Sequence, residues 1–326
     1  MVLLRSVVQE EVPFQKALTR AKTGDTIMVS PAPRGIENNT TFFTHMTGIL
    51  SVIGSDVFLN DRFVCNNDAK ETNGLGFLPF YDNILIYRRN KKDGKTMHEF
   101  YWIRPSVSTS SKNTVIVPKP AFCFEADELK IIPLSSGKGF IVIEEKTNKI
   151  WLFKEKRIMI MLFEKISAKD VVYEGPYVTY TDTPTSVVVG YQTQGVGGAT
   201  VTRFVRGHGG NRVAVHDHLG TNPPSIWATD YDFFYQNEVH DEKVIMSANT
   251  GLPTYHGEQG EFFTTSTALI RIIGSTVEAN GKLITDSFVK VHPQLITSHP
   301  DGILYIWNDE IRMLVIKDDD IKKKSK

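Results

Sequence analysis

The stretch that decides the fold is STVEANGKLIT, residues 275–285. In it, two short runs of alternating apolar and polar residues flank the pair Asn280-Gly281. Both residues of that pair tolerate the positive φ that a two-residue hairpin turn requires, so the stretch predicts an antiparallel β-hairpin. Four further pairs of runs surround short polar or glycine-rich turns: 83–89 with 96–104, 139–145 with 149–153, 185–193 with 199–206, and 303–307 with 310–316.

This repetition predicts a mainly β protein with antiparallel, hairpin-rich sheets, sandwich-like or barrel-like, and one or two short helices. The first helix is expected to begin at Pro13 and end at Gly24, and a short buried strand is expected at residues 26–29. A second helix is expected over residues 230–240, which have a partly apolar face. The hairpin rhythm also suggests propeller blades, but we find no periodic signature motif to accompany it.

Residues 167–185 interrupt the β pattern with proline-containing and glycine-containing segments. We therefore predict an N-terminal β-rich domain with a short leading helix at residues 1–166, a linker at 167–185, and a C-terminal β-rich domain at 186–326. The run at residues 17–29 resembles the helix-to-first-strand entry of parallel β-helix proteins. No repeat of coil length follows that run.

Charge and hydropathy restrict the classes of partner. The 326 residues include 37 basic and 37 acidic side chains, for a net charge of zero. Because binding a phosphate polymer needs a clustered positive field, we expect no nucleic-acid partner. No apolar stretch approaches the roughly 20 residues that span a bilayer, and no signal-peptide core is evident, so we expect no membrane partner. The two cysteines, Cys65 and Cys123, are too few for a disulfide framework.

The densest chemical feature is RGHGGNRVAVHDHLG, residues 206–220. Alternate residues of a strand share a face, so His216 and His218 could hold a divalent transition metal, with His208 as a third ligand. The spacing from the glycines to His-Asp-His resembles the first motif of cupins, which implies a metal-binding barrel or enzyme. The glutamate that this family carries downstream is missing, and Asn222 stands in that region. The alternative is a surface loop whose histidines bond locally or contact a neighbouring subunit.

A second candidate site is nucleophilic. Residues 24–28 and 44–50 resemble the arrangement of circularly permuted papain-like hydrolases, which implies His45 as the base and Cys123 as the nucleophile. An imidazole can lower the pKa of a thiol and stabilise the thiolate as an ion pair. The alternative for Cys123 is an inert core position, because residues 121–124 are an apolar run.

No complete catalytic set emerges, so enzyme activity is undecided and less favoured than a structural role. We expect an assembly protein without a cofactor: a virion component, such as a phage tail, baseplate or capsid-associated subunit, assembled in the host cytoplasm. Its expected partners are copies of itself or other virion proteins, contacted through β-edges and long loops at residues 190–198 and 207–224. Residues 43–48 and 61–66 resemble segments of contractile-tail baseplate wedge proteins.

Overall fold

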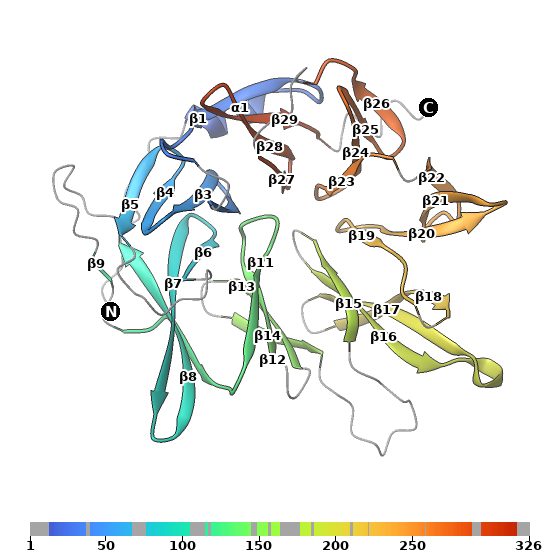
Figure 1. Ribbon diagram of the computed structural model, residues 1–326, viewed down its shortest axis with the longest axis horizontal. Helices are drawn as coiled ribbons and strands as arrows, with labels where there is room; N and C mark the ends of the chain where they lie inside the picture. Colours follow the sequence, from blue (N-terminus) through green and yellow to red (C-terminus); the bar gives the residue numbers. More distant parts are fainter. Residues whose placement is uncertain are drawn as a thin grey trace.

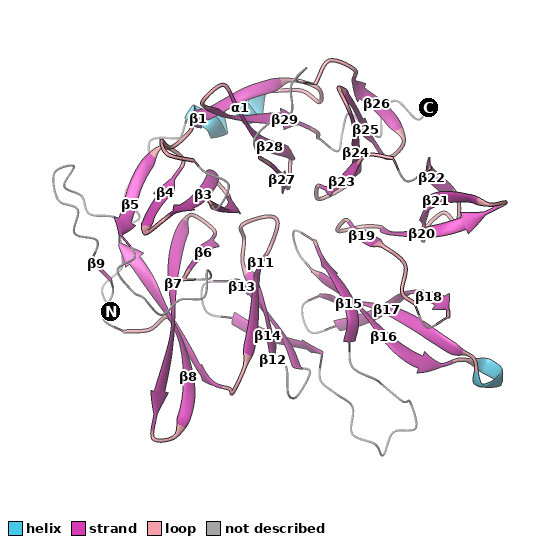
Figure 2. Ribbon diagram, viewed as in Figure 1, coloured by secondary structure: helices cyan, strands magenta, loops and turns pink. Residues whose placement is uncertain are grey.

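The computed structural model describes residues 13–36, 40–66, 76–104, 115–116, 119–144, 149–155, 158–163, 177–183, 186–208, 211–220, 222–257, 259–288 and 295–317. These residues form seven antiparallel sheets. The sheets surround a central axis as the blades of a seven-bladed β-propeller, and almost all regular structure is strand (Figures 1 and 2). The predicted mainly β, antiparallel class is confirmed. The predicted sandwich or barrel is corrected to a propeller, because each short sheet packs between two neighbours.

The first four blades follow one another along the chain. Blade 1 contains β2 (Thr41–His45), β3 (Gly48–Ile53), β4 (Asp56–Leu59) and β5 (Arg62–Asn66). Blade 2 contains β6 (Phe77–Phe80), β7 (Asn83–Lys92), β8 (Lys95–Arg104), β9 (Val115–Ile116) and β10 (Phe122–Glu125). Blade 3 contains β11 (Leu129–Pro133), β12 (Phe140–Glu144), β13 (Lys149–Glu155) and β14 (Ile158–Phe163). Blade 4 contains β15 (Tyr177–Asp182), β16 (Val187–Gln194), β17 (Thr200–His208) and β18 (Asn211–Leu219), with the short 3-10 helix η1 (Val196–Gly198).

The last three blades complete the circle. Blade 5 contains β19 (Ile226–Ala228), β20 (Phe233–Val239), β21 (Glu242–Ser247) and β22 (Pro253–His256). Blade 6 contains β23 (Glu261–Thr264), β24 (Leu269–Ile273), β25 (Thr276–Ala279) and β26 (Lys282–Thr285). Blade 7 contains β27 (Ile296–His299), β28 (Gly302–Trp307), β29 (Glu310–Val315) and β1 (Thr26–Pro31).

The ring is closed by segments from both ends of the described chain. Strand β1 pairs antiparallel with β29 and forms the outermost strand of blade 7. Helix α1 (Pro13–Arg20) precedes it and buries Phe14 and Leu18 in a core shared with blades 1 and 7. Lys317, just after β29, donates from Nζ to the carbonyl oxygens of Leu18 and Ala21, at 2.6 Å each. The two ends therefore stabilise one blade together.

Most of the core lies between neighbouring blades, so inner strands are buried on both faces. In β20, Phe233 packs with blade 4, whereas the next residue, Phe234, packs with blade 6. This explains a correction: the second helix predicted over residues 230–240 is strand β20. Two successive buried aromatic residues fit a strand covered on both sides as well as they fit a helix face.

The remaining local predictions concern the first helix, the hairpins, the strand at residues 26–29 and the linker. The first helix begins at Pro13 as predicted but ends at Arg20, before the predicted end at Gly24, and all five predicted hairpins are confirmed. The strand predicted at residues 26–29 exists as β1, but it is not buried: Met28 is 49% exposed because β1 lies at the rim. No parallel β-helix is present in the described residues, where every sheet pairing is antiparallel. Of the predicted linker, residues 167–176 and 184–185 lie outside the described residues, and β15 begins at Tyr177.

Blades 1 and 6 share a sequence repeat. Residues 47–60, TGILSVIGSDVFLN, align without gaps with residues 267–280, TALIRIIGSTVEAN. The two segments occupy equivalent places: each begins in the first turn of its blade and ends in the turn after the third strand. The repeat is therefore one structural unit used twice.

The asparagine that ends each repeat holds two turns together. Asn60 accepts a hydrogen bond from the amide of Ile49 and donates one to the carbonyl oxygen of Thr47, both at 3.0 Å. Asn280 makes the equivalent bonds in blade 6, at 2.9 and 3.2 Å. Their φ angles, 57° and 48°, lie in the left-handed region that asparagine tolerates better than most residues. Backbone conformation and side-chain bonding therefore favour the same residue.

Candidate functional site

The turns between the first and second strands of the blades form the polar centre of the molecule. Strands β19, β23 and β27, which lead into three of these turns, lie near the centre of the ring in Figure 1. We call the seven turns the turn ring. Its described residues are 45–48, 80–83, 134–139, 183, 186, 229–232, 265–268 and 299–302.

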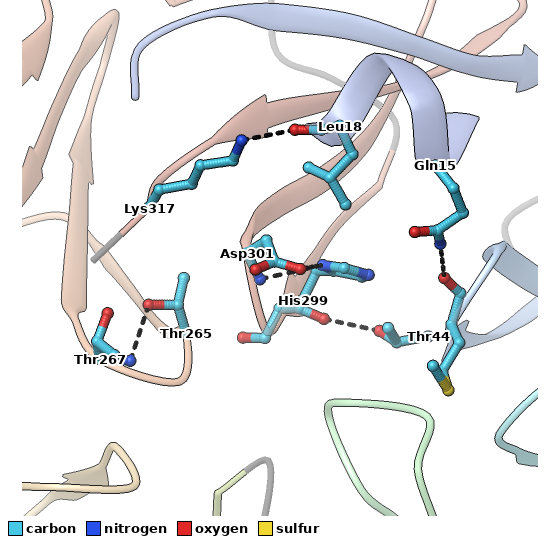
Figure 3. Close-up of polar contacts among 10 residues, drawn as sticks. Gln15, Leu18, Thr44, Thr265, Thr267, His299, Asp301 and Lys317 are labelled. Atoms are coloured by element: carbon cyan, nitrogen blue, oxygen red, sulfur yellow. Dashed lines mark hydrogen bonds and ion pairs between the residues drawn. The ribbon is translucent and has the colours of Figure 1, made fainter. Parts of the chain in front are cut away.

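Hydrogen bonds between neighbouring blades, made by the turn ring and the residues beside it, close a full circle. Part of this circle, around Thr44, is drawn in Figure 3. From blade 1 to blade 7 the bonds join His45 Nε2 to the Asn83 carbonyl (3.3 Å), the Tyr81 amide to the Gly137 carbonyl (2.8 Å), the Ser135 amide to Asp182 Oδ2 (2.8 Å), Thr183 Oγ1 to Asp230 Oδ1 (2.7 Å), the Asp230 amide to the Ser266 carbonyl (2.9 Å), the Ser266 amide to the Pro300 carbonyl (3.1 Å), and Thr44 Oγ1 to the Ser298 carbonyl (2.8 Å).

Within several turns, the first side chain accepts hydrogen bonds from the backbone of its own turn. The Nδ1 atom of His45 accepts from the amide of Thr47 at 3.2 Å, and His299 accepts from Asp301 at 3.1 Å (Figure 3). Thr265 accepts from the two amides that follow in its turn, at 3.3 and 3.0 Å. Such bonds satisfy backbone groups that would otherwise be buried without a partner. These polar side chains therefore stabilise the turns.

The turn of blade 3 reaches across the ring. A Cβ atom at Gly137 would lie 2.7 Å from the carbonyl oxygen of Thr44 in blade 1, so only glycine fits this approach. The neighbouring Ser136 is fully buried. Burial raises the pKa of Asp301 in blade 7, and the ammonium of Lys138 opposes this rise; at His299 burial lowers the pKa and Lys138 adds to the lowering. The polar groups at the centre are thus engaged with one another.

Burial sets the charge of the two histidines in the turn ring. It lowers the pKa of His45 to about 4, although the carbonyl of Asn83 and the charge of Asp82 raise it by smaller amounts. It also lowers the pKa of His299 to about 3, and Lys138 adds to this lowering. Both imidazoles are therefore neutral at pH 7, because protonation would place an unsolvated charge inside the ring.

The residues of the thiol-hydrolase alternative occupy different settings. His45 directs one ring nitrogen at Thr47 Oγ1 (2.9 Å) and the other at the carbonyl of Asn83 (3.3 Å). Cys123 lies on β10, paired with Glu99 of the neighbouring strand, and is exposed, so the core position considered for it is wrong. Cys65 is buried and forms no disulfide bond within the described part. Both ring nitrogens of His45 are thus occupied by groups other than a thiol.

Two of the three predicted metal ligands come together on β18. The ring of His216 stacks on that of Tyr235, with centroids 3.8 Å apart, and burial lowers its pKa, with a further lowering from nearby His218. The side chain of His208 lies outside the described residues. In the part of the chain that the structure describes, no group of three His, Cys, Asp or Glu side chains could hold a metal ion. Metal binding through His216 and His218 remains a hypothesis.

A cleft of about 670 Å³ lies between blades 5 and 6. Its walls mix charges: His256 Nδ1 lies 3.5 Å from Glu242 Oε2, and both side chains are more than half exposed. The guanidinium of Arg271 bonds to Glu278 and to the carbonyl of His256. The cleft is therefore a polar surface whose most buried cation is already paired.

Blade 4 has an unusual outer edge. Its outermost strand, β18, has nine residues, whereas the outermost strands of the other blades have four to six. No described strand pairs with its outer side. Val213 and Leu219 on this strand are 60% and 74% exposed, and Val196 at the tip of the β16–β17 hairpin is fully exposed. This edge offers both backbone hydrogen-bonding groups and apolar surface.

Comparisons with known proteins add no family. No protein-family model matches this sequence, and a search of curated proteins finds no match. Within the described ranges, no helix has the length and apolar character to cross a bilayer. The function of the chain is therefore inferred from the surface of the propeller.

The turn ring was missed in the sequence, although a signal for it exists. His45-Met46-Thr47, Thr265-Ser266-Thr267 and His299-Pro300-Asp301 share one pattern. In each, an acceptor side chain comes two residues before a threonine or aspartate, and an apolar strand follows. The pattern marks the first turn of a blade.

Proposed function

We propose that the protein is a structural assembly protein that acts through protein–protein contacts, with the β18 edge of blade 4 as its main contact surface. The main support for this proposal is the length of the unpaired edge together with its exposed apolar side chains. Proteins usually keep outer strands short or charged, because an open edge accepts strands from other chains. A long, open edge therefore favours a role in association.

The partner we propose for this edge is a second copy of the chain. Antiparallel pairing of β18 with itself is the arrangement that a twofold axis produces, and it would join two blades into one continuous sheet. Val213 and Leu219 would then lose exposed apolar surface. The turn ring supports a binding role over catalysis, because its polar groups bond to each other.

A virion is the setting we propose for this assembly role, with the protein as a tail, baseplate or capsid-associated subunit. The sequence resemblance to baseplate wedge segments motivates it. Purification of the protein within a larger particle would support this setting. Recovery only as free protein from infected cells would oppose it.

Size-exclusion chromatography with light scattering tests the contact surface. We expect the wild-type protein to dimerise with rising concentration, and the Val213→Lys/Leu219→Lys variant to stay monomeric, because two lysines oppose edge pairing. The matched control is Leu283→Lys, which replaces a leucine 58% exposed on the outer strand of blade 6 and should still dimerise. A wild-type protein that is monomeric up to its solubility limit would refute the proposal.

A further inference from the structure

The β7–β8 hairpin of blade 2 projects from the propeller. Its two strands have ten residues each, more than any other strand of the described chain. The hairpin extends well beyond the ring of blades in Figure 1. The turn at its tip, Asp93-Gly94, has φ angles of 53° and 77°, as a tight two-residue hairpin requires. The ends of these strands thus lie outside the packed body.

The tip concentrates positive charge in a protein whose net charge is zero. Residues 88–95, RRNKKDGK, contain five basic residues and one acidic residue. The two strands at the tip therefore carry a local excess of basic residues along their own sequence.

Contacts within the chain neutralise only part of this charge. Lys95 forms an ion pair with Glu125 at 2.9 Å, with both side chains more than half exposed, and such surface pairs add little to the stability of a protein. Arg89 donates to a backbone carbonyl, that of Asp127, at 3.0 Å. Lys91 is exposed and forms no ion pair with the described residues. The tip can therefore offer cationic groups to a partner.

The surroundings of the tip limit the size of that partner. Glu125, Asp127 and Glu128 are exposed beside the hairpin, and Glu125 stands opposite Met97 on the side of β8 away from β7. A nucleic-acid duplex carries one charge about every 1.7 Å and would also meet these carboxylates. A short acidic peptide segment can contact the tip alone. The carboxylates beside the hairpin thus favour a short acidic segment of a protein over an extended polyanion.

We propose that the tip of the β7–β8 hairpin binds a short acidic segment of a partner protein. Arg89 and Lys91 supply the cationic groups, and the projecting strands present them away from the body of the propeller. This contact goes beyond the self-association proposed for blade 4 and uses a different blade. Either contact can therefore exist without the other.

Fluorescence anisotropy with the full-length protein tests this contact. The probe is a labelled octapeptide of alternating glutamate and serine. We expect saturable binding that weakens as salt rises. The affinity of the Arg89→Glu/Lys91→Glu variant should fall at least about tenfold, because two attractive charges become repulsive. The matched control is Lys119→Glu, which reverses an exposed lysine of the same blade away from the hairpin and should keep most of the affinity.

Three results would overturn the proposal. They are absence of peptide binding at low salt, equal binding by wild type and Arg89→Glu/Lys91→Glu, and tighter binding of a duplex DNA or of anionic phospholipid vesicles than of the peptide. Light scattering on the same variant separates this contact from the blade 4 contact. Loss of peptide binding with dimerisation intact assigns the effect to the hairpin, whereas a monomeric wild type that binds peptide opposes only the blade 4 contact.

Discussion

Blades 1 and 6 have strands of four to six residues and share the asparagine-bonded turn, whereas blades 2 and 4 extend strands of eight to ten residues past the ring. In the short blades, turn residues such as Asn60 and Ser266 bond to the same or the next blade. The long blades expose edges, apolar side chains and cations. The comparison separates the residues that hold the ring from the residues free to contact other molecules.

The largest effect should follow from damage to the closure of the ring. Deleting residues 1–31 removes β1 and α1, so β29 would become an open edge in an apolar core. We expect the truncated chain to aggregate or remain unfolded. The finer test is Phe14→Ala, which empties a fully buried site and should lower the free energy of unfolding by about 3–5 kcal/mol in urea titrations.

Met28→Ala is the control for that experiment, because Met28 lies in the same segment but is half exposed. Its expected change is about 0.5 kcal/mol. If both substitutions changed stability equally, closure would not depend on the buried face of α1.

The second largest effect should be a loss of folding stability in acid, caused by protonation of histidines in the turn ring. The folded-state pKa values of His45 and His299, about 4 and about 3, lie below the unfolded value of 6.5. The unfolded chain therefore binds more protons as pH falls, so the stability from the neutral imidazoles is complete above pH 6.5 and declines toward pH 4. Each histidine should contribute a slope of about 1.4 kcal/mol per pH unit in that window.

Urea unfolding at several pH values measures this slope. The His45→Asn variant keeps an acceptor for the Thr47 amide but does not titrate, so it should lose about half of the pH dependence. An unchanged slope in this variant would show that other groups control acid unfolding.

The repeated asparagines should have smaller, independent effects. Asn60→Ala and Asn280→Ala each remove two hydrogen bonds and place alanine at a positive φ, so each should cost about 1–3 kcal/mol of unfolding free energy. Because blade 7 separates blades 1 and 6, the two costs should add within about 0.5 kcal/mol. The Asn60→Gly and Asn280→Gly variants adopt a positive φ without strain, so their loss of stability measures the hydrogen bonds alone. Strong non-additivity would mean that the ring transmits strain between blades.

The sequence predicted the hairpins because their turns are local: Asn280-Gly281 and Asp93-Gly94 adopt a positive φ whatever surrounds them. The propeller was harder to predict because the matching residues 47–60 and 267–280 are separated by four dissimilar blades. Burial on both faces also removes the alternation that marks a strand, as at β20.

The roles of the candidate site residues depend on tertiary contacts, which the spacing of residues along the sequence does not reveal. His216 and His218 do lie together, but the stacking of His216 on Tyr235 joins blades 4 and 5. His45 resembled a catalytic base, whereas its partners are a turn hydroxyl and a carbonyl of the next blade. A histidine that supports a turn and one that accepts a proton look alike in sequence.

The smallest effect on folding should come from the long blades. Val213→Lys/Leu219→Lys and Arg89→Glu/Lys91→Glu change exposed side chains, so each pair should alter the free energy of unfolding by less than about 1 kcal/mol. Urea titration beside the binding assays checks this. If either variant were as destabilising as Asn60→Ala, the long strands would belong to the framework of the ring, and the division between holding and contacting residues would fail.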